Sequence, residues 1–160
     1  MQLLSLSPFE LFEIVECFDI DKNLLNQKLL KLQLLYHPDS NNGTKQELGL
    51  LSSYVNQCYS LLASELERAS FLASKWIDFD IKDDKSRFVV NQYYDALEEV
   101  FELQSLLNKN DVDAINIVKA KVLDSSISLA KTLVSKESAL VNKDLIIKDI
   151  ITLKYLGSKV

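Results

Sequence analysis

The scarcity of helix-breaking residues is the feature that most constrains this fold. The 160 residues include only 3 glycines and 2 prolines, where average usage would give roughly 19 of the two together. Folds built from many short strands need many turns, which draw heavily on both residues. The hydrophobic share of 48% is too high for a largely disordered chain. The sequence therefore predicts an all-α fold of long helices, in one or two small domains.

The first half of the chain predicts four helices. Ser7, Pro8 and Glu10 fit a capping box with proline at the first helical position. Asp21 can cap the second helix. This helix must end at His37, because Pro38 disfavours helical backbone at the residue before it. The predicted helices span residues 8–17, 22–36, 45–63 and 66–76.

The second half predicts a linker and an antiparallel three-helix bundle. Residues 77–84 carry four aspartates that alternate with apolar residues, a pattern that also allows a short strand. Two short polar breaks then separate three helical segments, which is typical of antiparallel neighbours. The last helix carries apolar residues on more than one face, so we expect contacts beyond a single core stripe. The bundle helices are predicted at residues 85–107, 111–134 and 142–156.

Charge and cysteine usage exclude several classes of function. A net charge of −5 argues against a general nucleic-acid binder, because such proteins use positive charge to neutralise phosphates. One histidine and two separated cysteines, Cys17 and Cys58, support neither a metal cluster nor a disulfide framework, so both thiols are predicted to be core residues and no cofactor is expected. No apolar run is long enough for a membrane span, and no targeting peptide is visible. A cytoplasmic location is expected, ahead of the mitochondrial matrix.

The stretch LLYHPDSN is the most informative part of the sequence. Pro38 fixes its own φ and lacks an N–H, so the loop would leave the preceding helix in a defined direction. His37 can then orient the loop backbone, and Asp39 can accept a charge-assisted hydrogen bond from an arginine. Lys28 and Lys31 lie on the preceding helix and could meet an acidic partner. The alternative is an ordinary turn beside a solvated helix face.

These residues resemble those of a J domain, the module of DnaJ-type co-chaperones. The resemblance extends to Tyr36 and to the pattern Asn56-Gln57-x-Tyr59-x-x-Leu62 in the next helix. The segment Glu67–Leu72 (ERASFL) is similar to the HscB family, in which a J domain precedes a three-helix bundle. The resemblance implies a J domain at 1–76, a linker at 77–84 and a scaffold-binding bundle at 85–160.

The family resemblance also implies a function. Such a protein activates the ATPase of an HscA- or DnaK-type chaperone and is not itself an ATPase, in keeping with the lack of a glycine-rich phosphate loop. Leu34, Leu35 and Ser40 stand where the family usually has basic or polar residues, so the docking face carries fewer positive charges than usual. The leucines could instead form an apolar contact. The implied chaperone-binding residues are His37, Pro38, Asp39, Lys28, Lys31 and Tyr36.

In the first bundle helix, an acidic row lies beside an apolar one. Asp95, Glu98, Glu99 and Glu102 share one helix face, and the adjoining row is Val90, Tyr94, Leu97 and Phe101. The resemblance implies that this region binds an IscU-type iron–sulfur scaffold through Val90, Tyr94, Asp95, Glu98, Glu102 and Tyr155. If the family pattern is instead aligned on Phe88 and Gln92, Val89 and Tyr93 take the places of Val90 and Tyr94. The acids could equally be a solvated face, and the apolar row simply core.

Three other functions stay open at this point. The chain could be a J protein that serves another client, or a purely structural helical adaptor. It could also be an enzyme that uses His37 as general base and Asp39 to orient it, although no nucleophile or metal cluster accompanies them.

Overall fold

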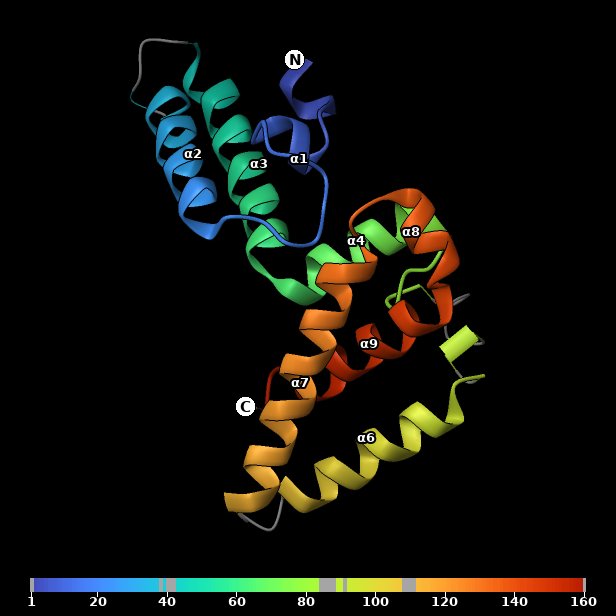
Figure 1. The fold of residues 1–160 in the computed structure, drawn as a ribbon. Coiled ribbons are helices and arrows are strands. Elements are labelled where there is room, and N and C mark those ends of the chain that lie inside the picture. The colour runs from blue at the N-terminus through green and yellow to red at the C-terminus, as the bar shows by residue number, and fades with distance from the viewer. Residues whose placement is uncertain are drawn as a thin grey trace. The chain divides into compact units, whose positions relative to one another are not determined.

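The structure is a computed structural model that describes residues 2–37, 39, 43–83, 89–90, 92–107 and 112–159. These residues form helices and contain no strand (Figure 1), which confirms the predicted all-α class. The strand considered for residues 77–84 is therefore absent from their described part, 77–83. The elements are η1 (Gln2–Ser5), α1 (Pro8–Leu11), α2 (Lys22–Leu35), α3 (Lys45–Ala63), α4 (Glu65–Ile77), α6 (Tyr94–Leu107), α7 (Val112–Thr132), α8 (Lys136–Val141) and α9 (Lys143–Leu156).

The chain divides into two compact units, residues 1–68 and 69–160, and the division lies within α4. The predicted domain limits lie further along the chain, at 76 and 84. Between them, Ile77, Phe79 and Ile81 are each at most 4% exposed. These residues belong to the second unit and contribute to its core.

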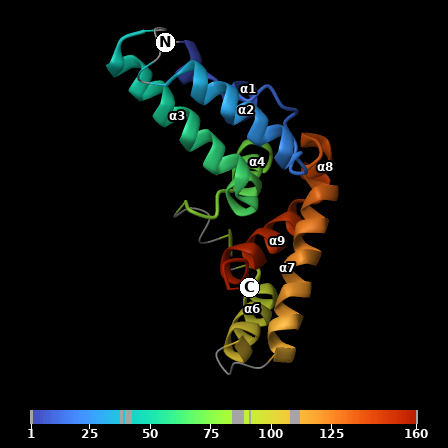
Figure 2. The ribbon, with the colours of Figure 1, turned by 90° about the vertical axis from the view of Figure 1, so that its left-hand side faces the viewer.

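The first unit is built on an antiparallel pair, α2 and α3 (Figure 2). Leu25 of α2 is buried, as are Leu48, Val55 and Leu62 at helical spacing on α3. Polar side chains also join the two helices. The Tyr59 hydroxyl donates to Asn26 Oδ1 at 2.8 Å, and Gln33 Nε2 donates to Asn56 Oδ1 at 3.2 Å. The register of the pair is therefore fixed by both apolar packing and hydrogen bonds.

The first helix is shorter than predicted, ending at Leu11 and not near Cys17. Glu13 adopts a left-handed φ of 49°, its N–H donates to the Glu10 carbonyl, and the Ile14 N–H donates to the Phe9 carbonyl. This is a Schellman end, which usually uses glycine at the left-handed position. Cys17 consequently lies outside the helix, and its thiol donates to the Asp19 carbonyl at 3.1 Å.

Arg68 is buried in the first unit and connects two of its segments. Its side chain is 3% exposed, and Nε donates to the Phe18 carbonyl at 2.6 Å. Nη1 donates to the carbonyl of Leu62, in the last turn of α3, where carbonyls lack partners inside the helix. The guanidinium carbon also lies 4.8 Å from the Phe18 ring centroid. Burial lowers the pKa of Arg68, yet these contacts replace the water that the cation loses.

In the second unit, α9 packs against both α6 and α7 (Figure 1). This central position explains why its apolar residues cover more than one face, as predicted from the sequence. The break predicted at 135–138 is partly wrong: Ser135 caps a further short helix, α8, through its hydroxyl and the Ser138 N–H. The buried apolar residues of α9 are Ile146, Ile147, Ile150, Ile151, Leu153 and Leu156.

The helix predicted from Lys85 is not continuous: residues 89 and 90 are helical, and α6 begins only at Tyr94. Lys85 itself lies outside the described residues. The N–H groups of Gln92 and Tyr93 donate to carbonyls three residues earlier, those of Val89 and Val90. Such tight bonds form a turn and interrupt the α-helical pattern. Val90 is therefore not part of α6.

We predict that Arg68→Met lowers the free energy of unfolding by at least about 2 kcal/mol, because it leaves two buried carbonyls without donors. Chemical denaturation followed by circular dichroism measures this loss. Lys119→Met, on the exposed surface of α7, is the matched control and should change stability little. Equal effects of the two variants would contradict the role assigned to Arg68.

Candidate functional site

The predicted corner presents two polar side chains at the surface, directly after α2. His37 and Asp39 are 62% and 77% exposed, while Pro38 and Ser40 lie outside the described residues. His37 Nδ1 accepts the Asp39 N–H at 3.2 Å. A nitrogen that accepts this bond carries no proton, so it cannot also donate to the Asp39 carboxylate 3.7 Å away. The imidazole thus orients the backbone and leaves the carboxylate accessible.

The lysines of α2 are mostly paired within the chain. Lys28 Nζ lies 2.5 Å from Glu13 Oε2, and this hydrogen bond lowers the pKa of Glu13. Lys22 Nζ lies 3.5 Å from Glu65 Oε1. Lys31 is exposed and forms no ion pair with another residue in the described part of the chain. Of the two lysines predicted to meet a partner, Lys31 is the one that forms no ion pair among the described residues.

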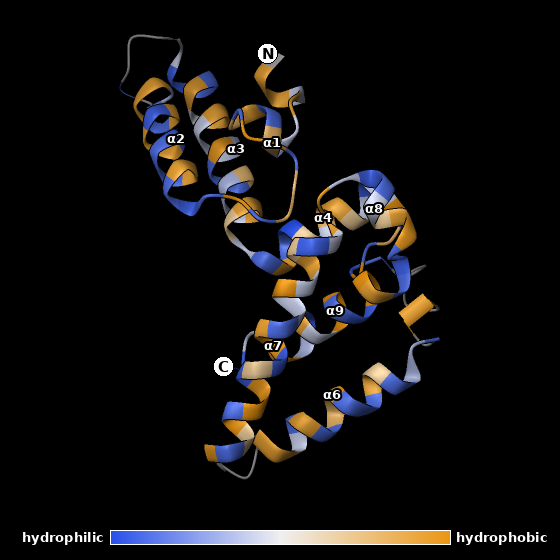
Figure 3. Ribbon diagram, in the orientation of Figure 1, coloured by the Kyte–Doolittle hydropathy of each residue, from blue (hydrophilic) through white to orange (hydrophobic). Residues whose placement is uncertain are grey.

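Leucines make up much of the outward face of α2. Leu30 and Leu34 are 60% and 79% exposed and lie one turn apart, on the side of the helix away from Leu25. Leu35 is 47% exposed, and Tyr36, half-buried, caps the helix end. In Figure 3 apolar and polar residues alternate along α2. The surface beside the corner is therefore more apolar than basic.

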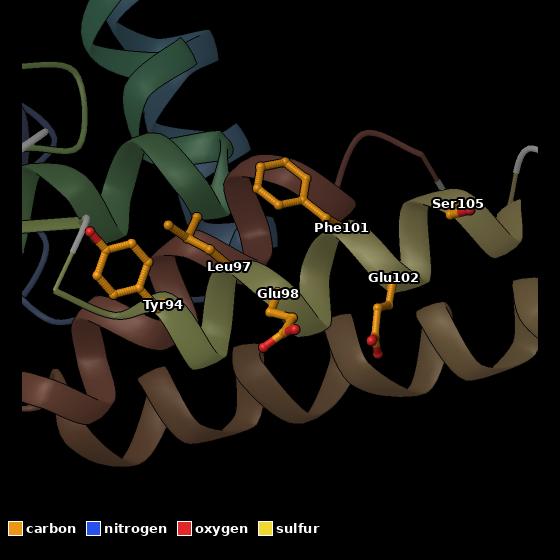
Figure 4. A pocket seen from close by; sticks show the side chains of 6 residues that line it. All are labelled: Tyr94, Leu97, Glu98, Phe101, Glu102 and Ser105. Carbon is orange, nitrogen blue, oxygen red and sulfur yellow. The ribbon is translucent and has the colours of Figure 1, made fainter.

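A second candidate surface lies along α6. An open hollow is lined by an apolar row, Tyr94, Leu97 and Phe101, and by Glu98, Glu102 and Ser105 (Figure 4). Tyr94 and Phe101 are 70% and 53% exposed. Three of the six predicted scaffold-binding residues thus line one hollow: Tyr94, Glu98 and Glu102.

The predicted acidic row divides into two parts. Glu99 is paired with Lys121 of α7, whose Nζ lies 2.8 Å from Oε1. Glu98 and Glu102 are exposed and form no ion pair with another described residue. Asp95 is exposed near the start of α6 but does not line the hollow.

The two alignments of the family pattern, one with Val90 and Tyr94 and the other with Val89 and Tyr93, differ in which tyrosine is exposed. Tyr94 is exposed, whereas the Tyr93 hydroxyl donates to Asp144 of α9 at 2.6 Å. Burial and this hydrogen bond raise the pKa of Tyr93 to about 12. Val90 is 9% exposed and Val89 is half-buried, so neither valine offers much contact surface.

Tyr155 of α9 reaches the same region of the second unit. Its ring centroid lies 5.9 Å from that of Phe101, and its carbonyl accepts a hydrogen bond from Gln104 Nε2 of α6 at 2.7 Å. Phe101 and Ser105 were not among the predicted site residues. The helical spacing of Phe101 from Tyr94 was visible in the sequence, but its exposure was not.

Other kinds of site find no support in the described residues. No group of three or more histidine, cysteine, aspartate or glutamate side chains there could hold a metal ion. Cys58 is buried in α3, as predicted for a core thiol. No helix among the described residues has both the length and the apolar character to cross a bilayer.

Curated sequences supply three informative relatives, although no family model matches. The chain is 41% identical over 69 residues to an HscB co-chaperone homologue of Acinetobacter baylyi, a match that spans 43% of this chain and 40% of that protein. It is 28% identical over 125 residues to HscB of Buchnera aphidicola, covering 72% and 71% of the two chains. The homologue from Haemophilus influenzae is 25% identical over 135 residues, covering 79% and 76%.

Two solved structures share the fold across nearly the whole chain. HscB from Vibrio cholerae superposes with a TM-score of 0.68 at 23% identity, covering 96% of this chain and 95% of that one. Human HscB superposes with a TM-score of 0.72 at 24% identity, covering 96% and 78%. At these identities the likeness concerns the fold, a hairpin unit followed by a three-helix bundle.

We predict that Tyr93 makes stability pH-dependent in the alkaline range, because burial of its hydroxyl and, second, the bond to Asp144 raise its pKa. Because the folded pKa is about 12 and the unfolded value about 10, this contribution to stability is complete below pH 10. It is lost as the pH rises toward 12, since the folded state then holds a proton that the unfolded state has released. Urea denaturation of the parent and Tyr93→Phe should show a stability difference that shrinks across this window. A difference independent of pH would contradict the assignment.

Proposed function

We propose that this chain, which belongs to the HscB family of co-chaperones, stimulates ATP hydrolysis by an HscA- or DnaK-type chaperone and delivers to it an IscU-type iron–sulfur scaffold. The chain would act in the cytoplasm, with both partners proteins and with neither nucleic acid nor membrane involved. It would supply no catalytic group, because hydrolysis takes place in the chaperone.

The exposed Asp39 carboxylate is the observation that carries this proposal. An exposed anion that its neighbouring histidine does not neutralise can form a charge-assisted, bidentate bond with an arginine. His37 fixes the backbone of Asp39 through the Nδ1 bond, which limits the entropy lost on docking. The α2–α3 pair provides a rigid base for this corner.

The remaining chaperone contacts would be partly apolar. Lys31 offers one charge, while the ion pair with Glu13 reduces what Lys28 can contribute. Leu30 and Leu34 lie on the same helix and would add apolar burial, at roughly 25 cal/mol per Å². Docking should therefore depend less on salt than docking through a face of unpaired lysines would.

The scaffold would bind the hollow on α6. Tyr94 offers an exposed aromatic ring, and Glu98 and Glu102 offer exposed negative charge beside it. Aromatic side chains dominate many protein interfaces, while charges improve orientation and association rate. A scaffold surface with apolar and basic residues would complement this arrangement.

Asp39→Ala should weaken, by at least about thirtyfold, the apparent affinity with which the chain stimulates the steady-state ATPase of its cognate chaperone. The reason is that losing one partner of an interfacial charge pair costs about 2–5 kcal/mol. Asp124→Ala, an exposed aspartate on α7, is the matched control and should stimulate normally. Unchanged stimulation by Asp39→Ala would contradict the proposal. A parent chain that stimulates but binds no scaffold would indicate a J protein for another client.

Tyr94→Ala combined with Glu98→Ala should weaken scaffold affinity at least about tenfold, or about 1.4 kcal/mol, and spare basal ATPase stimulation. Calorimetry with purified scaffold measures the first effect, and the ATPase assay measures the second. Leu123→Ala combined with Asp124→Ala removes one exposed apolar and one acidic side chain from α7 as the control. A loss of basal stimulation would show that the two surfaces do not work separately.

A further inference from the structure

Phe101 of α6 is exposed to solvent but lies close to another aromatic ring. The side chain is 53% exposed, lines the α6 hollow between Leu97 and Ser105 (Figure 4), and approaches the Tyr155 ring of α9 at 5.9 Å. Single exposed apolar residues are common on protein surfaces. Phe101, however, lines the same hollow as Tyr94 of α6 and also approaches Tyr155 of α9.

Charge complementarity indicates what could cover this surface. Glu98 and Glu102 lie one turn apart beside Phe101, and like charges at this spacing destabilise a helix slightly. Glu99, between them in sequence, is neutralised by Lys121 at 2.8 Å. A partner with basic groups flanking an apolar side chain would relieve the repulsion and cover Phe101 in the same contact.

The α9 side of this surface is held in place before any partner arrives. Gln104 Nε2 binds the Tyr155 carbonyl at 2.7 Å. Lys154 Nζ lies 5.5 Å from the Tyr155 ring centroid and donates to the Ile81 carbonyl at 3.1 Å. Such preorganisation reduces the entropy that binding costs.

We propose that Phe101 is the central apolar contact of the scaffold-binding surface and, with Tyr94 and Tyr155, selects a partner segment in which an apolar side chain is flanked by basic ones. This inference rests on the proposed function, and it assigns to the site a residue that the family resemblance did not supply. Apolar side chains at the centre of an interface commonly carry most of its binding energy, while rim charges mainly orient the partner.

The test measures binding of purified IscU-type scaffold to the full chain by calorimetry over a range of salt concentrations. Phe101→Ala should weaken affinity at least about tenfold and keep the salt dependence of the parent, because both glutamates remain. Glu98→Gln with Glu102→Gln should instead reduce the salt dependence. Phe101→Tyr, which keeps the ring, should bind within about threefold of the parent.

Ile117→Ala is the matched control, because Ile117 is also 53% exposed but lies on α7; it should bind like the parent. Phe101→Ala binding like the parent, while Tyr94→Ala with Glu98→Ala binds weakly, would overturn this inference and leave the proposed function standing. A flattened salt dependence for Phe101→Ala would also overturn it, because the residue would then act by positioning the acids. A parent chain that does not bind the scaffold would overturn both.

Discussion

The buried guanidinium of Arg68 is the interaction on which the first unit depends. A cation at 3% exposure is costly unless its N–H groups find acceptors. Here the acceptors are the Phe18 carbonyl in the segment before α2 and the Leu62 carbonyl at the end of α3. One side chain thus joins the end of α3, six residues before it, to the segment around Phe18, 50 residues before it. These bonds hold the segment before α2 against the end of α3, at the end of the antiparallel pair opposite to His37 and Asp39.

The same unit shows how a local backbone choice changes the chemistry of a surface. Glu13 occupies a left-handed position at the end of α1, which costs a residue with a Cβ roughly 1–2 kcal/mol. Its carboxylate meets Lys28 at 2.5 Å. The pair removes one positive charge from the face of α2 that we propose as the chaperone-docking side. Exposed Leu30 and Leu34 then become a larger part of what this face offers a partner.

In the second unit, one helix serves two purposes because its faces have different neighbours. Val100 and Leu103 of α6 are buried in the bundle, and Glu99 is bound to α7. The opposite face, with Phe101 and Glu98, lines an open hollow. An acid that the bundle neutralises stabilises the fold, whereas an acid left exposed beside aromatic rings is available to another protein.

The sequence alone determined the all-α class, α3 to the residue, and the end of α2 before His37, because capping residues, helical periodicity and proline act locally. It did not reveal the early end of α1, since that end uses Glu13 where glycine is the usual signal. Nor did it separate Glu99 from Glu98, or Tyr93 from Tyr94. Those distinctions depend on which side chains of α7 and α9 lie opposite, at Lys121 and Asp144. Periodicity places residues on a helix face, but only tertiary packing decides whether that face meets a neighbouring helix or solvent.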